Sequence, residues 1–323
     1  MSVAVIVPRL TADHALEACL DSLQAQTYRD VQIIVVDNSA RKLARPREGV
    51  TVIHNDRNVG FGAAVNQGIR AAQSTYIATL NDDAVAHPNC LEALVRAAEQ
   101  RHEIGMCAPQ IRLSGDRLDS AGMLVCGDAS SKQRGHLEPP SQYARPQHAL
   151  FPSGCAALYK REMLDEIGLF DESFFLYCED TDLGLRARWA AWECVYVPDA
   201  IVEHRYSHSA GAASPLKAQY VERNRLYVLA KNFPASMIAR APAYTLLRYA
   251  YHAAYAFHGR GAAGAFERKT ALPLIAARAH LDLLRSLPRL RRERKRIRRR
   301  LTSKQFRRLL SQYSIGPRQV AAL

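Results

Sequence analysis

Residues 76–83 read YIATLNDD, an apolar run from Tyr76 to Leu80 that ends in Asn81, Asp82 and Asp83. The apolar run favours a buried strand, so the acidic pair is expected where that strand ends. Ligands of open α/β sheets bind beyond the carboxyl ends of the strands, and hard divalent cations prefer carboxylate oxygens. The stretch therefore predicts an α/β fold with a metal site that could hold a diphosphate.

Around this stretch, short Val- and Ile-rich runs alternate with helical patterns. Alternation of this kind predicts a mainly parallel sheet with helices on both faces. Asp37-Asn38-Ser39 also follows an apolar run, as expected for a second strand that ends at the ligand-binding edge. The expected strands cover residues 3–7, 31–36, 50–54, 76–80, 154–159, 194–197 and 200–204, and the expected helices cover residues 12–26, 62–72, 88–100, 161–167 and 180–191.

A second acidic cluster, Glu179-Asp180-Thr181-Asp182, opens the helix expected over residues 180–191. A carboxylate can act as a general base that removes a proton from a hydroxyl, so Asp180 is a candidate base. Glu179 is expected to raise the pKa of Asp180 through its charge. Capping and the helix dipole also favour acids at a helix N-terminus, so a purely structural interpretation stays open.

Two later regions show different patterns. Between Leu113 and Leu150, clustered Ser, Gln, Pro and His predict a long loop. Beyond Ser214 the chain has a helical pattern almost to its end. We therefore expect two domains, an α/β catalytic domain over residues 1–213 and a helical extension over residues 214–323.

Composition limits the class of protein. A chain of 323 residues that is 48% hydrophobic can bury a large core, which excludes disorder throughout. Its seven cysteines form no Cys-x-x-Cys pair, so we expect reduced thiols in a cytoplasmic protein. The N-terminal residues do not resemble a signal peptide. The longest apolar region, residues 234–257, contains Arg240, Arg248 and His252, which favours a helix lying on a surface over a membrane span.

The net charge of +13 is concentrated in the C-terminal tail, where residues 281–323 contain 14 Lys and Arg against 2 Asp and Glu. Between Pro288 and Leu301 the pattern predicts a basic amphipathic helix with Leu290 and Ile297 on its apolar face. Such a helix suits an anionic membrane surface. A solvated or disordered basic arm remains the alternative. Nucleic acid is not expected as a partner, because no nucleic-acid module is present and the positive charge avoids the α/β region.

Six motifs follow one another in the first two thirds of the chain. They are Val35-Val36-Asp37-Asn38-Ser39, Asn58-Val59-Gly60-Phe61-Gly62 with Asn66, Leu80-Asn81-Asp82-Asp83, Gly168-Leu169-Phe170-Asp171-Glu172, Glu179-Asp180-Thr181-Asp182-Leu183 with Arg186, and His204 with Ser209. In order and spacing they resemble the family 2 glycosyltransferases, and within them the rhamnosyltransferase-like branch. The pair Arg223-Asn224 is also similar to that branch.

The resemblance implies a GT-A fold and an enzyme that inverts the anomeric centre of its donor sugar. Asp180 would be the general base, with Glu179 beside it. Asp83 and His204 would hold Mg²⁺ or Mn²⁺. The donor nucleotide would be bound by Pro8, Arg9, Asp37, Asn58, Gly60, Asn66, Asn81 and Asp82.

Several of these residues also have a simple structural explanation. Asp37 is typical of a turn in which the side chain bonds its own backbone. Gly60 suits a strand-to-helix turn, and a lone histidine such as His204 is more often structural than a ligand. The chain departs from the family at Pro8-Arg9-Leu10-Thr11, where a Thr-Tyr-Asn sequence is usual. It departs again at Asp82, which replaces a common proline.

The sequence therefore predicts an inverting glycosyltransferase that moves a sugar, with L-rhamnose the sugar that the resemblance suggests, from a dTDP- or UDP-linked donor. The acceptor would be a hydroxyl of a glycan or of a glycan linked to polyprenyl diphosphate, and the enzyme would be peripheral on the inner face of the cell membrane. A sugar nucleotidyltransferase is the enzymatic alternative, but it would normally carry a glycine-rich loop for a triphosphate after the first strand. A nucleic-acid-binding protein that uses the arginine-rich tail is the alternative from another class.

Overall fold

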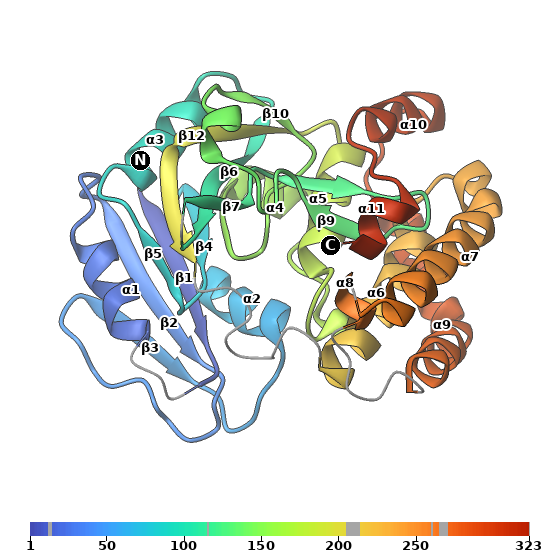
Figure 1. The fold of residues 1–323 in the computed structure, drawn as a ribbon. Coiled ribbons are helices and arrows are strands. Elements are labelled where there is room, and N and C mark those ends of the chain that lie inside the picture. The colour runs from blue at the N-terminus through green and yellow to red at the C-terminus, as the bar shows by residue number, and fades with distance from the viewer. Residues whose placement is uncertain (12–14, 115, 205–213, 260, 265–270, 323) are drawn as a thin grey trace.

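The computed structural model describes the chain except residues 12–14, 115, 205–213, 260, 265–270 and 323. One large mixed sheet with the strand order β10-β12-β6-β11-β4-β1-β2-β3 forms its centre (Figure 1). Its strands are β1 (Val3–Arg9), β2 (Val31–Asp37), β3 (Val50–His54), β4 (Tyr76–Leu80), β6 (Ile104–Leu113), β10 (Gln147–Ala149), β11 (Ala156–Lys160) and β12 (Glu193–His204). Two short strands, β5 (Ala84–Ala86) and β7 (Arg117–Ser120), pair with β12 and β6.

The parallel half of the sheet matches the expected alternation. β1 pairs in parallel with β2 and β4, and β2 pairs in parallel with β3. The fold class is therefore confirmed, with one refinement: β11 runs antiparallel to both β4 and β6, so the sheet is mixed. The two expected strands over residues 194–204 form the single strand β12, whose register shifts between Val197 and Ile201.

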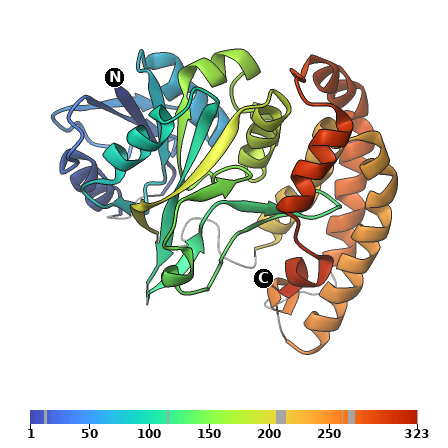
Figure 2. The same cartoon turned by 90° about the horizontal axis from the view of Figure 1, so that it is seen from above.

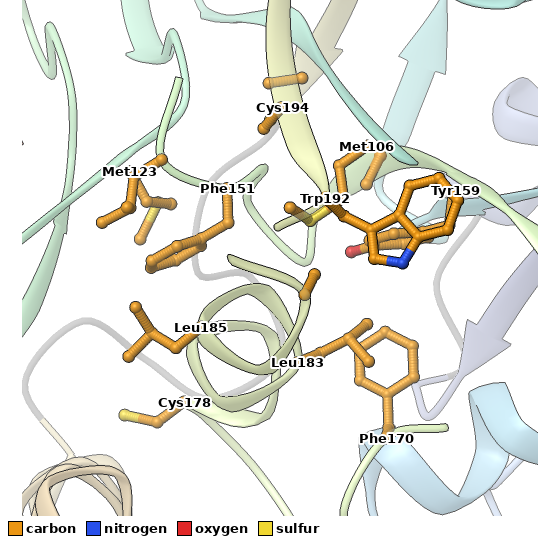
Figure 3. Packing of buried hydrophobic residues seen from close by; sticks show 14 of the residues in the cluster. Met106, Met123, Phe151, Tyr159, Phe170, Cys178, Leu183, Leu185, Trp192 and Cys194 are labelled. Carbon is orange, nitrogen blue, oxygen red and sulfur yellow. The ribbon is translucent and has the colours of Figure 1, made fainter. Parts of the chain in front are cut away.

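Helices cover both faces of the sheet. One face packs on α1 (Ala15–Gln24) and α3 (Cys90–Glu99), whose buried side chains join the apolar residues of β1 and β4. The other face carries α2 (Phe61–Ala71), α4 (Arg161–Ile167) and α5 (Glu179–Trp189). Figure 3 shows that Leu183 of α5 faces Phe170 and that Leu185 lies on the side of Phe151. These contacts fix α5, and with it the second acidic cluster, against the sheet.

The prediction of a long loop between Leu113 and Leu150 was wrong. This segment contains β7, the hairpin β8 (Met123–Val125) and β9 (Ser131–Gln133), the 3₁₀ helix η1 (Pro140–Tyr143), and β10. Leu118, Ala121 and Ala129 are fully buried in the main hydrophobic cluster. Strands of three or four residues are too short to show a clear alternating pattern, which explains the error.

The C-terminal region is helical, as expected. It contains α6 (Pro215–Asn232), α7 (Ala235–Phe257), α8 (Gly261–Gly264), α9 (Ala271–Arg296), α10 (Ser303–Gln312) and α11 (Pro317–Ala322), which stack beside the sheet domain (Figure 2). Tyr227, Phe233, Leu290 and Phe306 belong to the same hydrophobic cluster as α5. No helix in the described part of the chain is long and apolar enough to span a bilayer.

The tail does not present the free amphipathic helix that its sequence predicts. Leu290 is fully buried, and Ile297 and Leu301 pack against the main hydrophobic cluster. Arg300 is tied down as well, because its guanidinium pairs with Glu166 at 2.8 Å. The apolar face expected to contact a membrane is therefore used inside the protein.

Candidate active site

The two acidic clusters lie at one edge of the sheet, joined by the turn that precedes β11. The carbonyl oxygen of Cys155 accepts a hydrogen bond from the Asn81 amide at 2.9 Å. The amide of Gly154, one residue earlier, donates to Asp180 Oδ2 at 2.9 Å. Asn81 follows β4 and Asp180 lies in the first turn of α5. Two consecutive residues thus connect the expected metal site with the expected base.

His204, the last residue of β12, links Asp83 to an acid that the sequence did not suggest. His204 Nε2 lies 3.4 Å from Asp83 Oδ1, and Nδ1 lies 2.8 Å from Asp119 Oδ2. Asp119 in β7 is also 3.3 Å from His136 Nδ1. Four nearly buried side chains therefore form a row in the order Asp83, His204, Asp119 and His136. In this row a carboxylate orients each imidazole.

This arrangement determines the charge of His204 and its suitability as a ligand. Burial disfavours its charged form, but contact with Cys155 and the hydrogen bonds to Asp119 and Asp83 outweigh that effect and raise the pKa of His204 well above its ordinary value. Among the described residues, no group of three or more His, Cys, Asp and Glu side chains is arranged to hold a metal ion. Cation binding by Asp83 and His204 therefore stays a prediction, and it requires His204 to lose its extra proton, because a charged imidazole has no lone pair free for a metal.

Asp180 is partly exposed and firmly oriented. Its Oδ1 accepts from the Thr181 amide at 2.6 Å, and the Thr181 hydroxyl lies 2.9 Å from the Ser131 hydroxyl of β9. Burial raises the pKa of Asp180, although the hydrogen bonds from Gly154 and Thr181 act in the opposite direction. The structure thus combines two properties of a general base, a carboxylate with a raised pKa and a fixed direction.

Glu179 has a different environment. It is only 6% exposed, and burial together with the charge of Asp180 raises the pKa of Glu179 to about 8. Glu179 Oε2 is buried without a hydrogen-bond partner among the described residues. Glu179 is therefore neutral at pH 7, so it does not raise the pKa of Asp180 through its charge. That expectation is corrected: burial is the main cause of the shift at Asp180.

The loop before α5 has a strained backbone. Phe175, Tyr177 and Cys178 have φ values of 63°, 68° and 67°, a region that is costly for residues other than glycine. The side-chain amide of Asn224 in α6 holds the loop by donating to the carbonyl oxygens of residues 174, 176 and 177 at 2.9, 2.8 and 2.7 Å. Arg223 adds a bond to the Phe174 carbonyl at 2.8 Å. A helix of the C-terminal region therefore positions the loop that leads to Asp180.

The other charged residues of this motif are structural. Arg186 pairs with Asp182 Oδ2 at 2.8 Å, and its guanidinium also donates to the carbonyl oxygens of residues 167, 168 and 169. Asp182 Oδ1 accepts from Asn232 at 2.8 Å and pairs with Lys231 at 3.0 Å. Asp182 is fully buried, so these contacts hold α5 to the preceding loop and to α6.

Two of the residues expected to bind the donor nucleotide, Asp37 and Asn58, make hydrogen bonds within the protein. Asp37 is 1% exposed, and its carboxylate accepts from the Ser39 and Ala44 amides at 3.0 and 2.7 Å, which is the turn geometry of the structural interpretation. Asn58 accepts from the Gly60 amide and from Asn38 Nδ2, at 2.9 and 2.8 Å. These bonds shape the edge of the sheet beyond β2, and direct contact of Asp37 or Asn58 with a nucleotide stays a prediction.

Gly60 and Asn66 connect α2 to the loop after α4. Gly60 has a φ of 91°, and a Cβ there would lie 2.5 Å from the Phe175 carbonyl oxygen, so only glycine fits. Asn66 is 1% exposed and donates to the Phe170 carbonyl and to Glu172 Oε1, both at 2.9 Å. These two hydrogen bonds give Asn66 a structural role. Contact between Asn66 and the donor stays a prediction.

The remaining expected donor residues lie at the carboxyl ends of β1 and β4. Pro8 and Arg9 end β1, and the Arg9 carbonyl accepts from the Asn38 amide at 2.7 Å. Asn81 and Asp82 follow β4, and Asp82 is 7% exposed. Their position at the carboxyl ends of parallel strands agrees with a nucleotide site there. Ser209, which the sequence pairs with His204, lies outside the described residues.

A family model described as glycosyl transferase family 2 matches residues 4–168, which is more than half of the chain. The chain belongs to this family. A similar curated protein is the N-acetylglucosaminyl-diphospho-decaprenol L-rhamnosyltransferase of Mycobacterium tuberculosis, 29% identical over 236 residues that cover 64% of this chain and 77% of the relative. The motifs noted in the sequence thus belong to a glycosyltransferase.

Solved structures show the same fold at low identity. GalNAc-T7 with UDP, GalNAc and Mn²⁺ superposes with a TM-score of 0.60 and 15% identity, covering 78% of this chain and 51% of that one. The mannosyltransferase PcManGT of Pyrobaculum calidifontis, in complex with GDP-mannose and Mn²⁺, gives 0.52 and 16%, covering 88% and 75%. The fold of this glycosyltransferase is therefore of the GT-A type.

Sequence reasoning did not single out four charged or titratable residues near the candidate site, all in or facing the segment predicted to be a loop. Asp119 and His136 complete the row of acids and imidazoles. Lys132 of β9 has its pKa lowered to about 8 by burial and by the positive charges of Lys217 and Arg248. Lys217 of α6 lies near Asp119, whose negative charge acts on it. Asp119 lies in the four-residue strand β7, which is too short for a clear alternating pattern in the sequence.

Proposed function

We propose that this glycosyltransferase transfers a sugar from a nucleotide diphosphate to an acceptor hydroxyl with inversion, and that Asp180 is the general base. The observation that supports this most directly is that Gly154 donates to the partly exposed Asp180, while Cys155, the next residue of the same turn, contacts His204 of the Asp83–His204 pair. A base and a site for the leaving group at one sheet edge are what a direct displacement needs.

In the proposed reaction, the acceptor oxygen forms a bond to the anomeric carbon from the face opposite the diphosphate. Asp180 takes the hydroxyl proton, and the bond between the anomeric carbon and the diphosphate oxygen breaks with its electron pair leaving on the diphosphate. Asp83 and His204 would hold Mg²⁺ or Mn²⁺. When bound, the cation would neutralise charge on the departing diphosphate. The Mn²⁺ in the related solved structures supports this choice.

The similarity to a rhamnosyltransferase supports L-rhamnose as the first donor sugar to test. We propose dTDP or UDP as the nucleotide that carries it. The similarity also supports a glycan carried on polyprenyl diphosphate as the acceptor class, because the name of that relative specifies a decaprenol-linked substrate. A protein that acts on such an acceptor would work at the inner face of the cell membrane, and we place this one there as a peripheral enzyme. We keep residues 1–213 and 214–323 as its proposed domains.

The proposal is tested by thermal unfolding with a panel of nucleotide sugars, each with and without Mn²⁺. A true donor stabilises the native state, and we expect stabilisation that depends on the cation for at least one sugar. Asp83→Ala should remove this dependence. Equal midpoints with and without Mn²⁺ for every donor would refute the metal assignment. The product distinguishes the alternative enzyme, because a nucleotidyltransferase would release or consume inorganic diphosphate, whereas a glycosyltransferase releases the nucleoside diphosphate.

A further inference from the structure

Helix α7 carries its polar residues toward the protein and its apolar residues outward. Arg248, which is 6% exposed, pairs with Asp128 Oδ2 at 2.7 Å and with Glu222 Oε2 at 2.9 Å. Thr245 lies 3.5 Å from Arg225 Nη1 and Tyr249 bonds Glu222. Arg248, one of the two arginines that argued against a membrane span in the sequence, is thus buried inside the protein, whereas Arg240 is exposed.

The outer face of α7 contains no charged residue from Pro242 to Phe257. Its most exposed large side chains are Leu246, Leu247 and Phe257, at 68%, 52% and 88%, and Tyr244 and Tyr251 are 40% and 37% exposed. Leu246, Ala250, Ala253 and Phe257 follow one another at intervals of four, three and four residues, which places them on one side of the helix. The stripe from Leu246 to Phe257 covers about 17 Å at 1.5 Å per residue. Contiguous exposed apolar surface of this kind marks interaction sites.

Helix α9 adds exposed leucines with arginines among them. Leu274, Leu281 and Leu284 are 72%, 52% and 61% exposed, Arg278 and Arg285 are exposed between and beside them, and the exposed basic residues Arg291 and Lys295 follow. In both views α7 and α9 lie at the edge of the molecule away from strands β1 to β3 (Figures 1 and 2). The exposed residues of α7 from Pro242 to Phe257 are thus apolar or aromatic, those of α9 mix leucines with arginines, and the basic end of α9 forms a border.

The charge decides which partner suits this surface. A second copy of the chain would bring its own basic border to the interface, where like charges repel. The phosphates of a nucleic acid would pair with the arginines, but the leucines would stay exposed to water. An anionic bilayer accommodates both, because apolar side chains enter the acyl boundary and cations meet the phosphate headgroups.

We propose that the outer face of α7, together with the exposed leucines and basic end of α9, binds an anionic membrane surface. The assignment replaces the tail residues Leu290 and Ile297, which are packed inside the protein. The surface is also connected to the site, because Arg248 pairs with Asp128 next to β9 and Ser131 of β9 contacts Thr181 beside Asp180. A lipid-linked acceptor would then be delivered near the base, a purpose that rests on the proposed function.

The test is flotation of the full-length protein with vesicles of phosphatidylcholine and phosphatidylglycerol in a 7:3 ratio, compared with vesicles of phosphatidylcholine alone. We expect binding to the anionic vesicles and at least a tenfold loss of it in the double variant Leu246→Glu/Leu247→Glu. Leu137→Glu is the matched control, because Leu137 is 53% exposed but lies outside the C-terminal helices. An unchanged thermal midpoint shows that each variant is folded.

Binding of the double variant at the wild-type level would overturn the proposal. A wild-type protein that does not float, but forms a dimer that the double variant loses, would overturn it in favour of self-association. Replacing Arg291, Arg292, Lys295 and Arg296 by Gln should weaken binding to anionic vesicles, whereas an equal affinity would refute the role of the basic border. Stabilisation by nucleotide sugars is measured without vesicles, so failure of the membrane surface and failure of the proposed transfer are distinguishable.

Discussion

At the scale of single residues, two neighbouring acids in one helical turn have different properties because only one of them reaches the surface. Asp180 is partly exposed and hydrogen-bonded to the Gly154 and Thr181 amides. Glu179 is 6% exposed, and burial and the neighbouring charge raise its pKa to about 8. The difference supports Asp180 as the base and makes Glu179 a neutral neighbour at pH 7.

Replacing Asp180 by Asn should lower the turnover number about 10²- to 10⁴-fold, because a positioned general base contributes that factor. Binding of the nucleotide sugar should be unchanged, and thermal stability should change little. Steady-state kinetics and donor titration measure both quantities. Asp182→Asn is the contrasting variant, since Asp182 pairs with Arg186 and Lys231 and should mainly lose stability. Turnover retained in Asp180→Asn would remove Asp180 as the base.

Glu179 predicts a pH dependence of stability. Its folded pKa lies above the unfolded value, so the folded state binds the extra proton and the free energy of unfolding falls as pH rises from about 4.5 to about 8. In Glu179→Gln this fall should be weaker, and the variant should gain stability relative to wild type toward pH 8. Unfolding in denaturant at pH 5, 6.5 and 8 measures the difference. Parallel pH profiles for the two proteins would contradict the raised pKa.

At the scale of elements, the loop before α5 connects the C-terminal region to the proposed base Asp180. Its residues with positive φ are held by Arg223 and Asn224 of α6, and Asn224 is fully buried. Strained backbone persists only where its surroundings determine it. Arg223-Asn224 therefore acts on Asp180 through the loop, which makes Asn224 a positioning residue.

Asn224→Ala should lower both stability and turnover, because about 1–3 kcal/mol is lost when buried groups are left without hydrogen bonds. Arg161→Ala is the matched control. Arg161 also donates to three carbonyl oxygens, those of residues 69, 72 and 74, but at the opposite end of β4. Both variants should show a lower thermal midpoint, and only Asn224→Ala should show a lower turnover number in the folded protein. Equal turnover numbers for the two variants would reduce Asn224 to a stabilising residue.

At the scale of the whole molecule, one hydrophobic cluster crosses the proposed domain boundary. Trp189 at the end of α5 stacks on Phe306 of α10 with ring centroids 3.8 Å apart, and its Nε1 donates to the Asn232 carbonyl at 2.7 Å. Leu290 of α9 is fully buried in the same cluster. The helical extension therefore completes the core of the α/β region.

A fragment that ends at residue 213 should fail to fold as a stable monomer, because Trp189 and Phe174 would lose their packing partners. In the full chain, Phe306→Ala should cost about 3–5 kcal/mol of unfolding free energy, the usual range for a buried aromatic residue. Calorimetry of the variant and circular dichroism of the fragment measure these effects. A cooperative unfolding transition in the fragment would instead show that residues 1–213 fold independently.

The sequence by itself determined the features with local signals. The parallel strands β1, β2 and β4 were predicted from continuous apolar runs, and Asp83 was expected at the ligand-binding end because it follows a strand. The pairing of Asp83 with His204 came from the resemblance to the family. Local patterns could not determine contacts made between segments. Asp119 escaped notice because β7 is too short for a periodic pattern, and the neutral state of Glu179 depends on burial by the rest of the chain.

The tertiary structure also decided which apolar residues face outward. The tail pattern around Leu290 predicted an amphipathic helix for a membrane, yet that side chain is buried against α5 and α6. In α7, Arg248 interrupts the apolar sequence and argued against a membrane span, and its side chain turns inward to Asp128 and Glu222. Periodicity shows that a helix has two different faces, but which face is buried depends on the partners that the fold brings to it.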